Sequence, residues 1–229
     1  MENCQYLIVL HGWQSSKEKW TKVKENLERE GIKVIVPDLP GFKEETKLSQ
    51  PWNLDNYVEW LRKFSSNKEK FFLLGHSFGG RIAIKFSIKY PEEIKGLILV
   101  SSAGIKPKKR LVSNFVSLKK FSFLPGYSFL RKLFYKFIVK RTDYLYVDGI
   151  LKETFKKVIE RDLTSVLSQI KAKTLILWGQ RDKITPISNA YLMKEKINDS
   201  RLEIMKGIGH TPYSEDPETL AKKILDFIK

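Results

Sequence analysis

The sequence is poor in the residues that build disulfide bonds and metal sites. Its 229 residues include one cysteine, Cys4, and three widely separated histidines. A single cysteine cannot form an internal disulfide bond, and these few side chains show no recognisable spacing of metal ligands. We therefore expect neither a disulfide framework nor a bound metal ion.

Long apolar runs are also missing. No run reaches the roughly eighteen apolar residues that a transmembrane helix needs. The amino-terminal stretch MENCQYLIVLHGW lacks the basic start, long apolar run and small-residue cleavage site of a secretory signal. We expect a cytoplasmic protein without a transmembrane segment.

Negative charge is absent from one long segment. Between Lys106 and Arg141 there are eleven Lys or Arg residues and no Asp or Glu, and this segment supplies most of the net charge of +16. Strong positive charge favours anionic partners. The basic residues belong to no recognisable nucleic-acid motif, so we expect no nucleic-acid binding.

Short apolar runs alternate with amphipathic helical patterns along most of the chain. Runs of this length suit strands that are buried on both faces. The alternation predicts one α/β domain, with a parallel sheet of about six strands flanked by helices. The runs cover residues 6–10, 32–36, 71–74, 97–100, 174–178 and 202–205.

Capping residues mark several predicted helix starts. Ser15 and Glu18 match a capping box, and Asn53 can cap the next helical pattern. Thr185 and Asp216 each precede a proline, which favours the first helical position.

The alternation breaks once, between Ser102 and about Ile170, where helical apolar spacing continues without an intervening strand. This pattern predicts a helical insertion. We assign residues 1–104 and 166–229 to the α/β core and residues 105–165 to a basic helical cap. Helical spacing near the end of the insertion involves Leu151, Phe155 and Ile159.

The run FFLLGHSFGG, residues 71–80, combines an apolar strand, the pattern G-x-S-x-G and the start of a helical pattern. Such a turn lifts the hydroxyl of Ser77 above the edge of the sheet. Gly75 and Gly79 flank it because side chains there would collide across the turn. The helix that begins at Phe78 directs its backbone N–H groups toward the same place.

This element resembles the nucleophile elbow of the α/β-hydrolase superfamily. The resemblance extends from Tyr6 to nearly the carboxyl terminus, apart from the insertion. It implies a serine nucleophile at Ser77, a base on the loop after the last strand, and an acid after the strand before it. Because the chain begins almost at the first central strand, we expect the amino-terminal hairpin of the full fold to be absent.

His210 is the expected general base. It lies directly after the last apolar run, in GIGHTP, which resembles the G-x-G-H loop of the family. His11 ends the first predicted strand. His76 neighbours Ser77 on a sharp turn that should direct its side chain away from the hydroxyl.

Asp182 is the expected acid. It ends the run LILWGQRD, which resembles the strand-G-x-x-D element of the family. Asp38 also follows a strand, but it precedes Ser77 and suits the turn chemistry of its Pro and Gly neighbours. The strand that runs into Ser101 ends without a carboxylate. Asp182 would fix the tautomer of the base and stabilise its imidazolium form.

Two backbone N–H groups are expected to form an oxyanion hole. One belongs to Phe78, which follows the nucleophile. The other belongs to Trp13, since His11-Gly12-Trp13 resembles the family's H-G-x element. Such donors contribute roughly 2.7 to 4 kcal/mol each to an acyl-transfer reaction.

The resemblance implies that the segment at 105–165 is a lid. Lys132, Lys136 and Lys140 are spaced to share one helix face. That face could be merely solvated, or it could bind an anionic lipid surface, an acidic carrier protein or a carboxylate-containing substrate. The carrier alternative draws on the similarity of residues 11–13 and 75–77 to pimeloyl-acyl-carrier-protein methyl ester esterases.

These features imply a serine hydrolase that cleaves carboxylic esters of short to medium acyl chains through an acyl-enzyme, without a cofactor. The alternatives are a carrier-linked methyl ester esterase or thioesterase, a C–C bond hydrolase, and a non-catalytic hydrolase-like binding protein. The last alternative stays open because a fold alone does not establish an activity.

Overall fold

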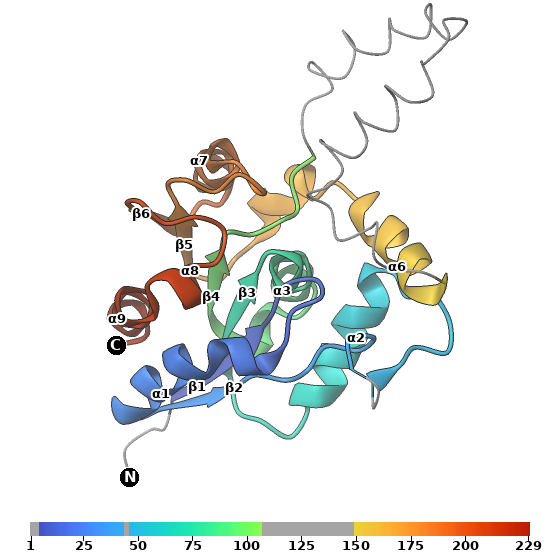
Figure 1. Cartoon of the computed structure of the whole chain (residues 1–229), viewed down its shortest axis with the longest axis horizontal. Helices are drawn as coiled ribbons and strands as arrows, with labels where there is room; N and C mark the ends of the chain where they lie inside the picture. Colours follow the sequence, from blue (N-terminus) through green and yellow to red (C-terminus); the bar gives the residue numbers. More distant parts are fainter. Residues whose placement is uncertain (1–4, 44–45, 107–148) are drawn as a thin grey trace, which may run out of the picture.

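A computed structural model describes residues 5–43, 46–106 and 149–229. In this part of the chain, six parallel strands form one sheet in the order β2-β1-β3-β4-β5-β6 (Figure 1). This arrangement confirms the predicted α/β architecture. The strands are β1 (Gln5–Leu10), β2 (Ile32–Ile35), β3 (Phe71–His76), β4 (Ile94–Val100), β5 (Thr174–Gly179) and β6 (Ser200–Met205).

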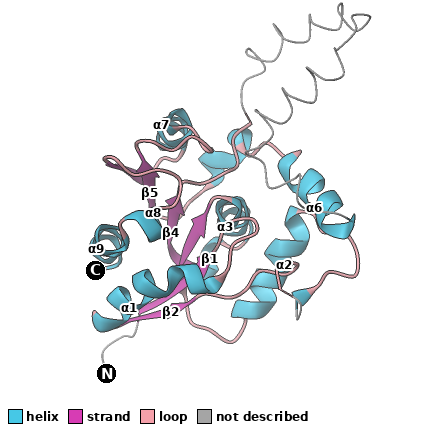
Figure 2. Cartoon of the chain, viewed as in Figure 1, coloured by secondary structure: helices cyan, strands magenta, loops and turns pink. Residues whose placement is uncertain are grey.

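Helices surround the sheet on both faces (Figure 2). The helices of the described chain are α1 (Thr21–Arg29), α2 (Leu54–Ser65), α3 (Phe78–Lys89), α6 (Gly149–Ile159), α7 (Ile187–Lys196), α8 (Pro212–Glu215) and α9 (Pro217–Ile228). Short 3-10 helices are η1 (Lys17–Trp20), η3 (Pro91–Glu93) and η8 (Thr164–Gln169).

Alternate residues of each strand enter two separate cores. In β1, Leu7 and Val9 pack with α1 and α9, whereas Ile8 and Leu10 pack with α2 and α3. Because side chains alternate across a strand, a strand in the middle of the sheet needs apolar residues at every position. This double burial explains why the central strands are continuous apolar runs in the sequence.

Two strands begin earlier than their apolar runs predicted. β4 begins at Ile94 and includes Lys95, whose amino group donates to the side-chain oxygen of Gln5, 2.8 Å away. β6 begins at Ser200 and lies at the edge of the sheet, where Arg201 is exposed. Because the side chains at these positions are polar, the apolar runs in the sequence do not show where these two strands begin.

The predicted helix caps have mixed outcomes. Asn53 caps α2 as expected, because its side chain accepts hydrogen bonds from the backbone of Asp55 and Asn56. Asp216 caps α9 through the N–H of Thr219. The capping box at Ser15 is wrong: a 3-10 helix precedes α1, and the Glu18 carboxylate binds Lys43 instead.

The predicted cap at 105–165 lies mostly outside the described residues. Its described end contains α6, which confirms the helical spacing of that stretch. The hydroxyl of Thr154 accepts a hydrogen bond from the N–H of Trp52 at 3.0 Å. Arg81, on α3, donates to the carbonyls of Val158 and Arg161 at 3.3 and 2.8 Å. These bonds fix α6 to the core.

The cap of α2 gives a test of local stability. Replacing Asn53 with Ala removes the acceptor for two N–H groups, so we expect the free energy of unfolding to fall by about 1 kcal/mol. Urea denaturation measures the change. Asn198→Ala, at an exposed loop position, is the matched control and should change stability by less than about 0.5 kcal/mol. Equal stabilities of the two variants would contradict the capping role.

Candidate active site

Ser77 lies on a strained turn between β3 and α3. Its φ and ψ angles are 49° and −111°, in a region that non-glycine residues rarely adopt. Strain of this kind persists only where the surrounding structure enforces it. The N–H of Ser77 donates to the carbonyl of Val100 at 3.2 Å, and its carbonyl accepts from the N–H of Ala103 at 2.9 Å. The end of β4 therefore holds the turn in place.

Three glycines let the turn close. A Cβ atom on Gly75 would lie 2.5 Å from the carbonyl oxygen of Gly79, and one on Gly79 would collide with the carbonyl of Leu10. The contact at Gly75 confirms the predicted collision across the turn, whereas Gly79 lacks room because of the end of β1. A Cβ atom on Gly80 would collide with the side chain of Ser102, a requirement that the sequence pattern did not reveal.

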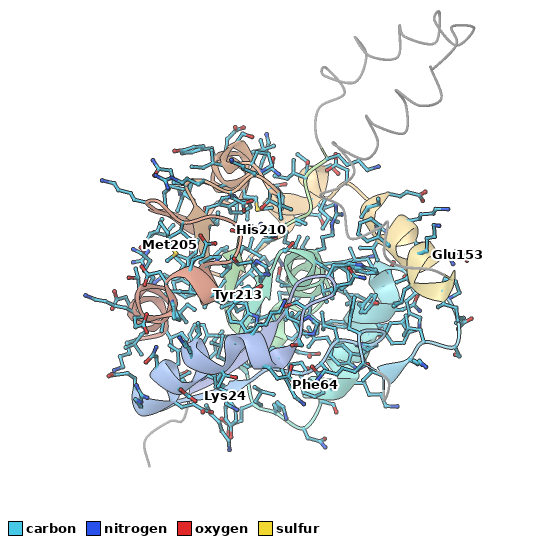
Figure 3. All side chains as sticks on the ribbon, in the orientation of Figure 1. Lys24, Phe64, Glu153, Met205, His210 and Tyr213 are labelled. Atoms are coloured by element: carbon cyan, nitrogen blue, oxygen red, sulfur yellow. The ribbon has the colours of Figure 1, made fainter. Side chains whose placement is uncertain are left out.

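His210 and Asp182 are joined by a direct hydrogen bond. The distance between His210 Nδ1 and Asp182 Oδ2 is 2.8 Å. The Asp182 side chain is fully buried, and 12% of the His210 side chain is exposed. Figure 3 labels His210 on the loop between β6 and α8. The structure thus brings together the two residues that the sequence predicted as acid and base.

Asp182 is surrounded by hydrogen-bond donors. Its Oδ1 atom accepts the N–H groups of Ile184 and Thr185 at 2.8 and 2.9 Å. Burial alone would raise the pKa of the Asp182 carboxyl, but the hydrogen bond and charge of His210, together with the bonds from Thr185, lower the pKa below its ordinary value. The carboxylate is therefore ionised at neutral pH.

Thr185 was predicted as a helix cap, but its hydroxyl lies beside Asp182 and His210. Its hydroxyl does not cap α7, whose N-cap is Pro186 without a side-chain bond. The hydroxyl oxygen lies 2.7 Å from Asp182 Oδ2 and 3.3 Å from His210 Nδ1. Because the carboxylate is the charged acceptor, it takes the hydroxyl proton. The position of Thr185, three residues after Asp182, was the only signal in the sequence.

His76 supports the loop that carries His210. Its buried imidazole donates from Nε2 to the carbonyl oxygen of His210 at 2.8 Å. The His76 ring also lies 5.0 Å from the ring of His210 and 5.0 Å, edge-on, from that of Tyr213, measured between centroids. The sequence placed His76 beside the nucleophile but gave no sign of this contact.

Ser77 shares the carboxyl edge of the sheet with this pair, since β3, β5 and β6 are parallel. The Ser77 hydroxyl forms no side-chain hydrogen bond within the described residues. In the absence of substrate, a nucleophile and its base are often too far apart for a hydrogen bond and approach each other only in the complex.

The loop after β1 covers the turn at Ser77. A Cβ atom on Gly12 would lie 3.5 Å from Ser77 Cβ and 3.0 Å from His76 Nδ1. His11 fixes this loop, because its Nε2 accepts the N–H of Leu39 at 3.0 Å and its Nδ1 lies 2.8 Å from the carbonyl oxygen of Gly12. The loop therefore lies directly against the turn.

The two predicted oxyanion donors belong to the two segments that meet here, the start of α3 and the loop after β1. Phe78 is the first residue of α3, so its N–H has no partner within the helix. The N–H of Trp13 donates no backbone hydrogen bond in the described loops and turns. Both N–H groups fit donors to a ligand at Ser77.

Aromatic side chains form one wall beside the turn. The indole ring of Trp13 makes edge contacts with three rings at centroid distances of 4.8, 5.1 and 4.9 Å. One of these rings, Phe155, belongs to α6, and all four rings pack in the core that lies between the sheet and helices α2 and α3. The aromatic wall consists of Trp13, Phe42, Phe78 and Phe155.

Metal-binding geometry is not found in this part of the chain. Among residues 5–43, 46–106 and 149–229, no group of three His, Cys, Asp or Glu side chains lies close enough together to hold a metal ion.

Comparison with known proteins identifies the class of this fold and site. A family model described as alpha/beta hydrolase fold matches residues 5–144, and a second, described as TAP-like protein, matches residues 155–229. The chain belongs to the alpha/beta hydrolase family, as the sequence predicted.

Individual relatives are distant but align over most of their length. The chain is 23% identical to the monoacylglycerol lipase ABHD6 of Mus musculus, covering 97% of this chain and 75% of the relative. It is 24% identical to a 2-hydroxy-6-oxononadienedioate/2-hydroxy-6-oxononatrienedioate hydrolase of Pseudomonas putida, covering 99% of this chain and 89% of the relative.

A solved structure shows the same architecture. The crystal structure of a membrane phospholipase A, a bacterial virulence factor, superposes with a TM-score of 0.76 at 25% identity, covering 100% of this chain and 80% of that chain. In the described part of the present chain, no helix is both long and apolar enough to cross a membrane.

The buried imidazole of His76 makes stability depend on pH. Burial, and then the neighbouring charge of His210, lower the pKa of His76 from 6.5 to about 3. Between these values the unfolded chain binds a proton that the folded chain does not. The stability of the folded chain therefore falls as the pH falls through this range, by about 1.4 kcal/mol per pH unit from this group.

We expect His76→Gln, which keeps an amide donor but cannot titrate, to flatten this dependence. Urea unfolding of both proteins at about pH 7, 6 and 5 measures it. His11, whose pKa is also lowered by burial, is present in both proteins and cancels in the comparison. Parallel stability curves for the two proteins would contradict the assignment to His76.

Proposed function

We propose that the protein is a serine hydrolase that cleaves carboxylic esters of short to medium acyl chains through an acyl-enzyme intermediate. Ser77 is the nucleophile, His210 the general base and Asp182 the acid that orients it. The observation that carries the proposal is the 2.8 Å hydrogen bond between His210 and Asp182, at the sheet edge where Ser77 occupies a strained turn. The lipase among the relatives supports the same class of reaction.

The proposed reaction has two stages. His210 Nε2 takes the proton of the Ser77 hydroxyl as Oγ attacks the ester carbonyl carbon, and the backbone N–H groups of Trp13 and Phe78 bind the oxyanion. The intermediate collapses when His210 gives its proton to the leaving alcohol. Water, deprotonated by His210, then attacks the acyl carbon. The bond to Ser77 Oγ breaks as His210 returns the proton to that oxygen, and the acid is released.

Asp182 supports both proton transfers. Its carboxylate accepts the Nδ1–H of His210, which leaves Nε2 free to accept a proton from Ser77. The imidazolium that forms is stabilised by a negative charge held in a buried site. Because donors from Thr185 keep that carboxylate ionised, the orientation of the base persists through the neutral pH range.

The aromatic wall supports an uncharged, apolar acyl group as the substrate. Arg81 is a buried cation one turn along α3 from Ser77, but its Nη1 atom donates to main-chain carbonyls at the end of α6 and just after it. The aromatic wall adjoins the Ser77 turn through Phe78, the residue that follows Ser77. Rings of this kind favour apolar groups through burial of their surface.

Cleavage of a carbon–carbon bond is a second candidate. The 2-hydroxy-6-oxononadienedioate hydrolase of Pseudomonas putida aligns with nearly the whole chain. The substrate in its name is an oxo-dicarboxylate rather than an ester, so this relative favours the candidate. A serine, a base and an oxyanion hole could serve both reactions. The two candidates differ in substrate, so a panel of substrates can distinguish them.

The assignment of the nucleophile is tested with p-nitrophenyl butyrate. Ser77→Ala removes the attacking oxygen, so we expect kcat/KM to fall by at least about 1,000-fold. Ser66→Ala, at the exposed end of α2, is the matched control and should retain the wild-type rate. Equal rates for wild type and Ser77→Ala would overturn the assignment of Ser77.

A substrate panel tests the reaction class. We expect p-nitrophenyl acetate, butyrate and octanoate to be cleaved faster than the palmitate ester, in keeping with the proposed short to medium acyl chains. The panel also contains a thioester, a lactone and a meta-cleavage dienoate. A dienoate rate above all ester rates would favour carbon–carbon cleavage, and no turnover of any substrate would favour a binding protein.

Thr185 gives a sharper test of the acid. Thr185→Val keeps the side-chain volume and removes a donor to an ionised carboxylate, a loss of about 1.5 kcal/mol, so kcat/KM should fall roughly tenfold. Thr174→Val is the matched control, since Thr174 is a buried threonine whose hydroxyl donates to Ala172 at the opposite end of β5. The same rate for both variants would refute the role of Thr185.

A further inference from the structure

The loop that carries His210 is held by a second carboxylate. Glu215, the last residue of α8, accepts the N–H of Gly209 at 2.7 Å on one oxygen. Its other oxygen accepts the N–H and the hydroxyl of Thr211 at 3.1 and 3.0 Å. One side chain therefore binds the backbone on both sides of His210.

The geometry of the loop is adapted to this contact. A Cβ atom on Gly209 would lie 3.1 Å from Oε1 of Glu215, so a larger residue would push the carboxylate away. A Cβ atom on Gly179, at the end of β5, would collide with the carbonyl of Gly209. The loop therefore lies in close contact with the end of β5 on one side and with Glu215 on the other.

Two carbonyls of the loop are also bound. The N–H of Arg181 donates to the carbonyl of Ile208 at 2.8 Å, and His76 donates to the carbonyl of His210. Among these contacts, Glu215 supplies the only negative charge that binds the backbone of the described loop. Removing it would leave the N–H groups that flank His210 without their charged acceptor.

Glu215 also brings a negative charge to the loop that carries His210. Burial raises the pKa of the Glu215 carboxyl, but the bonds from Gly209 and Thr211 together lower it by more, so that its pKa lies below the ordinary value. The charge of Asp182 opposes this lowering. Two titratable groups contact His210 directly: the Asp182 carboxylate at Nδ1 and the imidazole of His76, whose ring centroid lies 5.0 Å from that of His210. Glu215 binds the residues on either side of His210, and Tyr213 packs against His76.

We propose that Glu215 is a positioning residue for His210. It fixes the loop so that the imidazole stays aligned with Asp182, and its negative charge stabilises the imidazolium that forms during the reaction. This inference rests on the proposed role of His210 as the general base.

The test separates charge from hydrogen bonding. Glu215→Gln removes the charge and one acceptor, so we expect kcat to fall about tenfold with KM within twofold, and the acid limb of the kcat/KM profile to move to lower pH. Glu215→Asp keeps the charge but shortens the side chain, so kcat should fall while the acid limb stays near its wild-type position. Glu25→Gln, an exposed position on α1, removes the same charge and is the matched control.

A role confined to stabilising α8 would change the melting temperature but neither the acid limb nor the ratio of kcat to KM. Wild-type kcat and an unmoved acid limb in Glu215→Gln would overturn the inference. If that variant does not fold, a wild-type kcat in Glu215→Asp would overturn it instead. Turnover that survives Ser77→Ala or His210→Ala would overturn the proposed function itself, whatever the Glu215 variants show.

Discussion

The close approach of α3 to the end of β1 is the constraint on which the rest of the site depends. Gly79 leaves no room for a Cβ atom beside the carbonyl of Leu10, so the first turn of α3 lies directly against the loop that follows β1. This contact places the backbone of Phe78, the first residue of α3, beside the loop that carries Trp13. Ser77, which immediately precedes α3, has a strained conformation at the same place.

Backbone strain and buried polar groups occur together at the carboxyl edge of the sheet. The two apolar cores stabilise the fold and offset their cost. Ser101, at the end of β4, has a φ angle of 44°, and its buried hydroxyl has no hydrogen-bond partner within the described chain. The indole N–H of Trp13 is buried without a partner there as well. Such costs are typical of functional sites, where geometry rather than stability is selected.

The sequence predicted those parts of the molecule that depend on local pattern and chain order. Six strands follow from apolar runs, and Ser77, Asp182 and His210 follow from the residue types that end particular strands. Thr185 and Glu215 could not be predicted in the same way, because their partners are set by how loops fold back on themselves. Ser15 shows the converse. The sequence matches a capping box there, but in the folded chain Glu18 binds Lys43 instead.

The surroundings of each ionisable group, rather than its residue type, determine whether it is charged and what it does. Burial lowers the pKa of both His11 and His76, so both imidazoles are neutral at neutral pH. Their hydrogen bonds hold the loops beside Ser77 in place. Asp182 is also buried, yet three donors and a neighbouring imidazole keep it charged. The site therefore keeps negative charge next to His210 and excludes positive charge from the residues that support it. With His11 and His76 neutral, Asp182 and Glu215 are the charged groups that bind His210 and its loop.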